Sequence, residues 1–155
     1  SPLYYSNSTM GRESAAQGER QGQNRLKRRG LSMNFKSNET IGSQIIEYVK
    51  KKIFSGAYAC GTRLPAIREF ALACRVNPNT IVKVYAELSA EGLIYTDSTN
   101  GKFVTTDEVF ILQKREEFLR EKAAAFAQEV REAGGGADEV ANLLGEAFRI
   151  GRGKE

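Results

Sequence analysis

Asn77, Asn79, Thr80 and Lys83 place four hydrogen-bonding side chains within one short stretch of the chain. An Asn amide can pair with the edge of an adenine, and Thr and Lys can reach phosphate oxygens or other base edges. Asn77-Pro78 is also a strong helix start, because the Asn side chain accepts from a free backbone N–H and proline presets φ at the first position. We therefore expect these side chains at the N-terminal end of a helix, where free N–H groups attract phosphate.

Each of these residues also has an ordinary structural role. Asn77 would cap the helix whatever else it does, and Lys83 on an exposed face could simply be solvated. The gathering of these hydrogen-bonding residues at the start of one helix favours nucleic-acid recognition. The charge distribution agrees: residues 1–32 carry a net charge of +4, residues 33–106 carry +3, and residues 107–155 carry −3. A basic middle and an acidic end are typical of a nucleic-acid-binding module joined to a part that avoids phosphate.

The surrounding residues predict two further helices and a hairpin. An apolar stripe at helical spacing begins after Thr40 and ends at Gly56. Leu64-Pro65 is expected to open a second helix with proline in its first position, and Gly92 is expected to stop the third helix. Two short apolar runs around a polar loop at residues 96–101 then indicate a β-hairpin. Three helices followed by a hairpin predict a winged helix-turn-helix, a mainly α fold with a small β-hairpin.

The C-terminal part predicts two amphipathic helices that need a partner. Apolar residues follow a heptad-like spacing interrupted at Glu116, and a glycine triplet at 134–136 allows the chain to reverse before a second helix. A second copy of the chain, related by two-fold symmetry, is the simplest partner that would bury these apolar faces. The predicted dimerisation residues are Val109, Leu112, Leu119, Ala123, Phe126, Val130, Leu144 and Phe148.

The predicted organisation has three parts. Residues 1–32 form a disordered or vector-derived extension, with a basic arm as the alternative; residues 33–106 form the DNA-binding domain; residues 107–155 form a two-helix dimerisation segment. The chain has no histidine, and Cys60 and Cys74 are too few and isolated for a zinc site or a disulfide framework. We therefore expect no catalytic residue, metal or cofactor. Since no apolar stretch could cross a bilayer, we expect a cytoplasmic protein without a membrane partner.

Several motifs together resemble the winged helix-turn-helix domain of the GntR family of bacterial regulators. They are Ile41-x-x-Gln44-Ile45, Gly61-x-Arg63-Leu64-Pro65-x-x-Arg68-x-x-Ala71, Asn77-Pro78-Asn79-Thr80, Tyr85-x-x-Leu88-x-x-x-Gly92-Leu93-Ile94 and Gly101-x-Phe103-Val104. The Asn-Pro-Asn-Thr version, with a C-terminal part under 50 residues, is similar to the YtrA subfamily.

The resemblance implies a DNA-contacting surface made from three elements. Arg68 would contact the DNA near the operator's two-fold axis, the start of the third helix would read bases, and the hairpin would approach the minor groove. The predicted set is Arg63, Arg68, Asn77, Pro78, Asn79, Thr80, Lys83, Asn100, Gly101 and Lys102. Two departures matter: Ala66 replaces the usual capping serine, and the hairpin loop lacks the usual arginine and first glycine, with Lys102 offering a phosphate contact instead.

The expected function is a homodimeric DNA-binding transcriptional regulator, a repressor by family analogy, on a palindromic operator. A small-molecule effector, if one exists, would bind at the dimer interface or between the two domains. The alternative is a winged-helix protein-interaction module that does not read DNA, which an apolar outer face on the third helix would favour.

Overall fold

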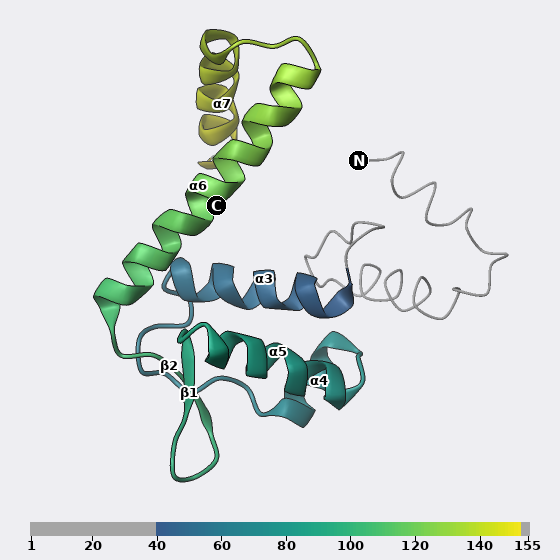
Figure 1. Ribbon diagram of the computed structural model, residues 1–155, viewed down its shortest axis with the longest axis vertical. Helices are drawn as coiled ribbons and strands as arrows, with labels where there is room; N and C mark the ends of the chain where they lie inside the picture. The colour runs from purple at the N-terminus through teal and green to yellow at the C-terminus, as the bar shows by residue number, and fades with distance from the viewer. Residues whose placement is uncertain (1–39, 153–155) are drawn as a thin grey trace, which may run out of the picture. The chain divides into compact units, whose positions relative to one another are not determined.

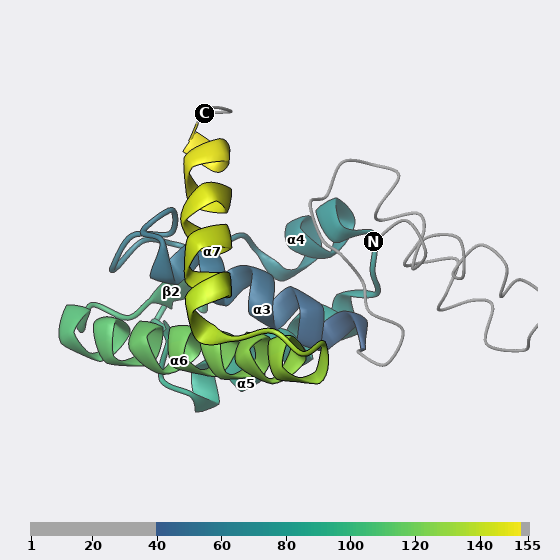
Figure 2. The same ribbon diagram turned by 90° about the horizontal axis from the view of Figure 1, so that it is seen from above.

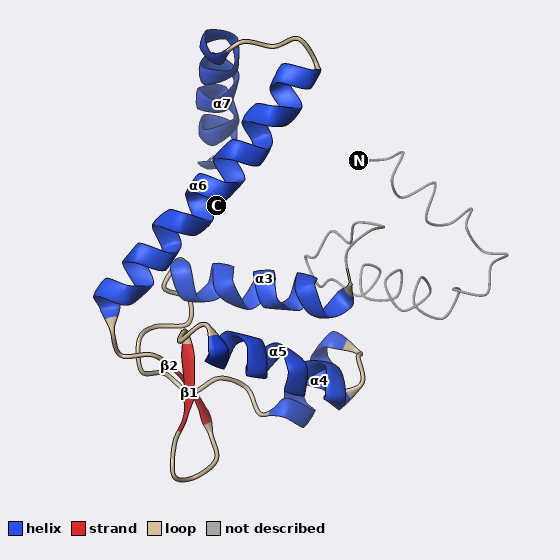
Figure 3. Cartoon of the chain, in the orientation of Figure 1, coloured by secondary structure: helices blue, strands red, loops and turns tan. Residues whose placement is uncertain are grey.

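The computed structural model describes residues 40–152. Their elements are α3 (Ile41–Phe54), α4 (Ile67–Cys74), α5 (Pro78–Ala90), β1 (Ile94–Thr96), β2 (Lys102–Val104), α6 (Glu108–Glu132) and α7 (Ala137–Arg152), as Figure 1 and Figure 3 show. The predicted order of three helices, a hairpin and two more helices is confirmed. The predicted extension and residues 33–39 lie outside the described range. The chain divides into two compact units between Ile111 and Leu112, inside α6.

Helix α3 begins and ends where its local signals predict. The Thr40 side chain accepts a hydrogen bond from the Ser43 backbone N–H at 3.1 Å, which satisfies one donor of the first turn. Ser55 ends the helix, and Gly56 follows with a φ of +83°, a conformation that glycine adopts without strain. The apolar stripe faces inward, because Ile45, Val49 and Ile53 are all buried.

The predicted start of α4 at Leu64-Pro65 is wrong: the helix begins at Ile67. Residues before it are held in extended form by partners distant in sequence. The Leu64 N–H donates to the Lys102 carbonyl at 2.8 Å, and the Pro65 carbonyl accepts from the Tyr85 hydroxyl at 2.7 Å. Ala66 is the N-cap residue of α4. Its side chain makes no capping hydrogen bond, as expected where alanine replaces the usual serine.

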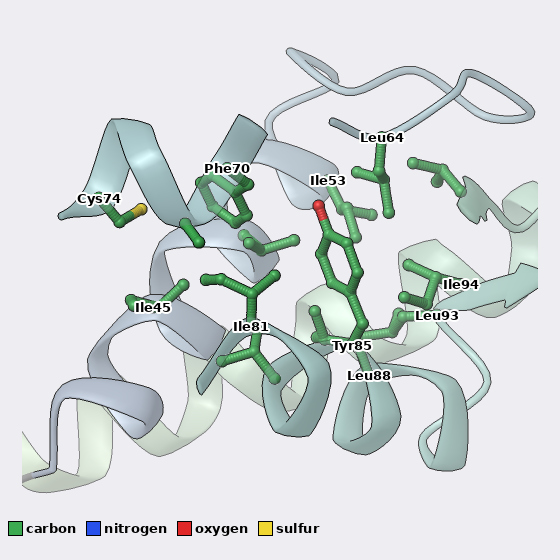
Figure 4. Packing of buried hydrophobic residues seen from close by; sticks show 14 of the residues in the cluster. Ile45, Ile53, Leu64, Phe70, Cys74, Ile81, Tyr85, Leu88, Leu93 and Ile94 are labelled. Atoms are coloured by element: carbon green, nitrogen blue, oxygen red, sulfur yellow. The ribbon is translucent and has the colours of Figure 1, made fainter. Parts of the chain in front are cut away.

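The core of the first unit lies between α3, α4, α5 and the hairpin. α3 and α4 both pack on α5. Figure 1 shows α3 running beside α5, and Figure 2 gives the view of the same chain from above. Figure 4 shows Tyr85 directed into this core, where burial raises the pKa of its hydroxyl and its ring stacks with Phe70 at 6.0 Å between centroids. Packing on three sides therefore fixes the orientation of α5 within this unit.

The hairpin is antiparallel and carries a third extended segment beside it. Ile94 pairs with Val104, Tyr95 with Phe103, and Thr96 with Lys102. Backbone hydrogen bonds also join Val104 to Gly61 and Thr62, at 3.0 and 2.9 Å. The strand hydrogen bonds of β2 thus continue into the segment that precedes α4, which ties the hairpin to the helix-turn-helix.

The two cysteines are free thiols in different environments. Cys74 is buried at the end of α4, and burial raises its pKa from the ordinary value to about 11. A thiol of that kind stays protonated and unreactive near neutral pH. Cys60 is half-buried in the loop between α3 and α4. Cys74 is therefore a packing residue of the core.

Helices α6 and α7 present apolar side chains to solvent. Of the predicted dimerisation residues, Val130 alone is half-buried; the exposed ones are Val109, Leu112, Leu119, Ala123, Phe126, Leu144 and Phe148. Leu143 and Ile150 on α7 are exposed too, and sequence reasoning missed them. Gly134, with a φ of +81°, begins the turn between α6 and α7. Within residues 40–152, no helix combines the length and apolarity that crossing a membrane requires.

Candidate nucleic-acid interface

The N-terminal end of α5 is built by Asn77 and Pro78. Asn77 has an extended backbone, and its Oδ1 accepts from the Asn79 N–H at 2.8 Å. Pro78 occupies the first helical turn, where its missing N–H would have had no partner in any case. The predicted cap is confirmed. Because the cap occupies Oδ1 of Asn77, a contact with DNA would fall to its Nδ2 amide group.

The face of α5 that carries the predicted base-reading residues points to solvent. Asn79 and Lys83 are exposed, whereas Ile81, Val84, Tyr85 and Leu88 on the other side are buried. Thr80 is half-buried beside the start of α3, and a Cβ at Gly42 would stand 4.0 Å from its methyl group. Hydrogen-bonding groups therefore stand outward at the helix end that attracts phosphate.

The turn between α4 and α5 contains a basic residue that sequence reasoning missed. Arg75 ends α4 with a φ of +56°, in the left-handed region, and is exposed. Its N–H donates to Leu72 at 3.2 Å and the Val76 N–H donates to Ala71 at 3.0 Å, the pattern of a Schellman motif. Glycine is the usual residue at this position of the motif. An arginine in the turn of a helix-turn-helix was therefore the sequence signal that could have identified Arg75 as a candidate. Arg68 is exposed on α4 itself.

A single carboxylate organises the hairpin loop. Oδ1 of Asp97 accepts from the Thr99 hydroxyl, from the Thr99 N–H at 2.9 Å and from the Gly101 N–H at 3.1 Å. These hydrogen bonds, with the Thr99 hydroxyl foremost, lower the pKa of Asp97, and the Arg63 charge adds to the effect. Asn100 takes the left-handed conformation with a φ of +64°.

The other predicted hairpin residues gather around this loop. Gly101 is buried, and a Cβ at its position would stand 3.0 Å from the Phe103 ring and 3.3 Å from Nε of Arg63. The Arg63 side chain therefore lies along the hairpin. The Lys102 ammonium donates to Oγ1 of Thr96 across the strands at 2.6 Å. Gly101 keeps space for its neighbours, while Arg63, Asn100 and Lys102 offer polar groups on the hairpin.

The predicted contact residues thus form two groups within the first unit. One group occupies the N-terminal end of α5, with Arg68 on the adjacent α4. The other occupies the hairpin, which follows the opposite end of α5 after Gly92 (Figure 1). A helix end and a hairpin on one small domain are the two elements with which a winged helix contacts DNA.

Known proteins share this arrangement. Residues 41–104 match the model of the bacterial regulatory proteins of the gntR family. The structure of a GntR family transcriptional regulator from Listeria monocytogenes is 30% identical, with a TM-score of 0.67, over 72% of this chain and 98% of that one. The chain belongs to the GntR family.

Two relatives of this GntR regulator come from Bacillus subtilis (strain 168). YhcF, an uncharacterized HTH-type transcriptional regulator, is 27% identical over 67% of this chain and 86% of its own. YtrA, an HTH-type transcriptional repressor, is 35% identical over 48% of this chain and 58% of its own. The predicted likeness to the GntR family and to YtrA is confirmed. The protein is a transcriptional regulator with a DNA-binding helix-turn-helix; the role of each contact residue stays a prediction.

Replacing Arg75 by glycine is expected to stabilise this GntR regulator and to weaken its DNA binding. A left-handed L-residue costs about 1–2 kcal/mol relative to glycine, so Arg75→Gly should raise the free energy of unfolding by about 1 kcal/mol in urea titrations. If the exposed Arg75 guanidinium contacts a phosphate, its loss should reduce the salt dependence of DNA binding by about one charge. Arg75→Lys is the matched control, since it keeps both the charge and the strain. DNA affinity equal to wild type in Arg75→Gly would exclude Arg75 from the DNA-contacting surface.

Removing the Asp97 carboxylate is expected to loosen the hairpin loop without unfolding the domain. Asp97→Ala deletes the acceptor of three hydrogen bonds, so the Thr99 and Gly101 amides should exchange with solvent faster in NMR experiments. Since the folded pKa lies below 3.8, this stabilisation is complete above that pH and is lost as the pH falls through the folded value. Ser98→Ala in the same loop should leave both amides unchanged. Unaltered exchange in Asp97→Ala would refute this role.

Proposed function

We propose that this chain is a homodimeric repressor that reads a palindromic operator with the N-terminal end of α5. The observation that carries the proposal is the outward placement of Asn79 and Lys83 beside the capped helix start, opposite a fully buried face. Asn79 would form two hydrogen bonds to an adenine, and Lys83 would reach a phosphate or a guanine. Arg63 and Lys102 on the hairpin would contact the adjacent backbone.

Dimerisation is supported by the unpartnered apolar faces of the second unit. Leu119 and Phe126 on α6 are 47% and 45% exposed, and Phe148 on α7 is 66% exposed. Exposed large apolar side chains at heptad-like spacing favour an interface, and a second copy related by two-fold symmetry would cover both helices. The two DNA-binding domains of such a dimer, called its heads below, would contact half-sites separated by one helical turn of DNA, roughly 34 Å, or a multiple of it.

Repression is supported by the relative YtrA, which is named a transcriptional repressor. A dimer that occupies a promoter excludes polymerase sterically, so tight binding alone is sufficient for this effect. An effector, if the protein has one, would act by binding the dimer interface or the junction between units and changing the separation of the two heads.

The test is a binding titration against the DNA upstream of the protein's own gene. Footprinting would locate the operator, and fluorescence anisotropy would compare it with a scrambled duplex at two salt concentrations. We expect saturable binding that favours the operator. Affinity should fall by about 10³- to 10⁵-fold between 50 and 200 mM salt if six to ten phosphates are contacted. Equal affinity for operator and scrambled duplexes would overturn sequence-specific readout and favour the interaction module.

A further inference from the structure

The outer face of α5 carries an apolar side chain among its polar ones. Val82 is 47% exposed, one turn after Asn79 and next to Lys83. Positions 79, 82, 83 and 86 are spaced three and four apart, so they share one helix face. Ile81 and Val84, on either side of Val82 in sequence, both point into the core. Val82 therefore belongs to the surface proposed to meet DNA.

Folding gives no reason for a valine at this position. The core side of α5 is already filled by Ile81, Val84, Tyr85 and Leu88. On an exposed helical face, the β-branched valine is a poorer helix former than alanine or lysine, because its χ1 freedom is restricted. Its neighbours on this face are Asn79, Lys83 and the small Ala86, and Val82 is the only large apolar side chain that α5 exposes. Val82 therefore does not belong to a large apolar patch on this helix.

The major groove of DNA offers one apolar feature that an isolated valine can recognise, the C5-methyl group of thymine. Residues three apart on a helix are separated by about 4.5 Å along its axis, and successive base pairs by ~3.4 Å. Val82 would consequently lie over a base pair one or two steps from the one that Asn79 reads. This interpretation rests on the proposed function, since it requires α5 to enter the major groove.

We infer that Val82 is a specificity-determining residue that contacts a thymine methyl group, so each half-site holds an A·T pair at one defined position beside the base read by Asn79. The contact removes the valine methyls and the thymine methyl from water together. Burial of one methyl-sized group corresponds to about a fourfold change in affinity.

The experiment replaces single thymines of the footprinted operator by deoxyuridine, which lacks only the methyl group. Wild-type protein should lose affinity about fourfold at one thymine in each half-site. Val82→Ala should bind the parent operator about fourfold more weakly, and it should bind the parent and the deoxyuridine duplex at that position equally. Alanine is the better helix former, so the variant keeps α5, and circular dichroism should show unchanged helicity.

Leu72→Ala is the control, because it truncates an 80% exposed apolar side chain on the neighbouring α4. It should keep the full sensitivity to deoxyuridine. The inference is overturned if wild-type protein binds every substituted operator like the parent, or if Val82→Ala retains the sensitivity at the same thymine. Equal binding of the parent operator and a scrambled duplex is a different outcome, which overturns the proposed function as well.

Discussion

Asn79→Ala is expected to weaken operator binding by about 1–3 kcal/mol, or roughly 5- to 160-fold, and to relax specificity at one position of each half-site. The reason is that a paired Asn amide discriminates adenine by two hydrogen bonds, and truncation removes both. The Asn79 side chain is exposed, and the substitution keeps the backbone N–H of residue 79 that donates to the Asn77 cap. Anisotropy titrations with the operator and its single-base variants measure the effect.

Asn77→Ala provides the contrast for this prediction. That substitution removes the Oδ1 acceptor of the helix cap, so it should lower the free energy of unfolding by about 1 kcal/mol. Asn79→Ala should leave the unfolding free energy within ~0.5 kcal/mol of wild type, as expected for an exposed residue. If Asn79→Ala instead lowered the free energy of unfolding and left the affinity for the operator unchanged, Asn79 would not belong to the base-reading surface.

Leu119→Glu is expected to convert the protein into monomers and to abolish tight operator binding. Leu119 is exposed on α6 in the predicted seam, where a charge buried against a partner without a counter-ion is strongly destabilising. A monomer keeps one head, and so loses the gain of two linked contacts, which is on the order of 10²- to 10⁴-fold in affinity. Sedimentation velocity measures the oligomeric state, and titration with the operator measures the loss of affinity separately.

Ala124→Glu is the matched control for this substitution. It introduces the same charge on the same helix, five residues further along and therefore on a different face, where the side chain is also exposed. This variant should remain dimeric and should bind the operator normally. A dimer that survives Leu119→Glu would refute the assignment of the seam, whereas dissociation of both variants would indicate a general effect of charge on α6.

Local signals predicted most of the elements that position the interface. The capping pair Asn77-Pro78 and the stop at Gly92 both act on residues within one or two turns, so their effect could be read without knowing the fold. The predicted hairpin formed for the same reason, with a turn-forming loop between two short apolar runs. The GntR resemblance followed from these same motifs and is confirmed by a family model that spans them.

Contacts between distant residues decided what local signals could not. Pro65 lies before α4 because its carbonyl binds the Tyr85 hydroxyl, twenty residues away, and because Leu64 is paired with Lys102. The same pairing brings Arg63 against the hairpin and leaves little room for a side chain at Gly101.

The sequence by itself determined the helices, the hairpin, the family and the polar character of the recognition helix, because these depend on residue types within a few positions of one another. Only the tertiary structure decided that Gly101 is buried and that Val82 stands outward beside Asn79. Those features depend on which surfaces α5 shares with α3, α4 and the hairpin. Side-chain exposure is a property of the packed unit, since burial is assigned by neighbours that lie far away along the chain.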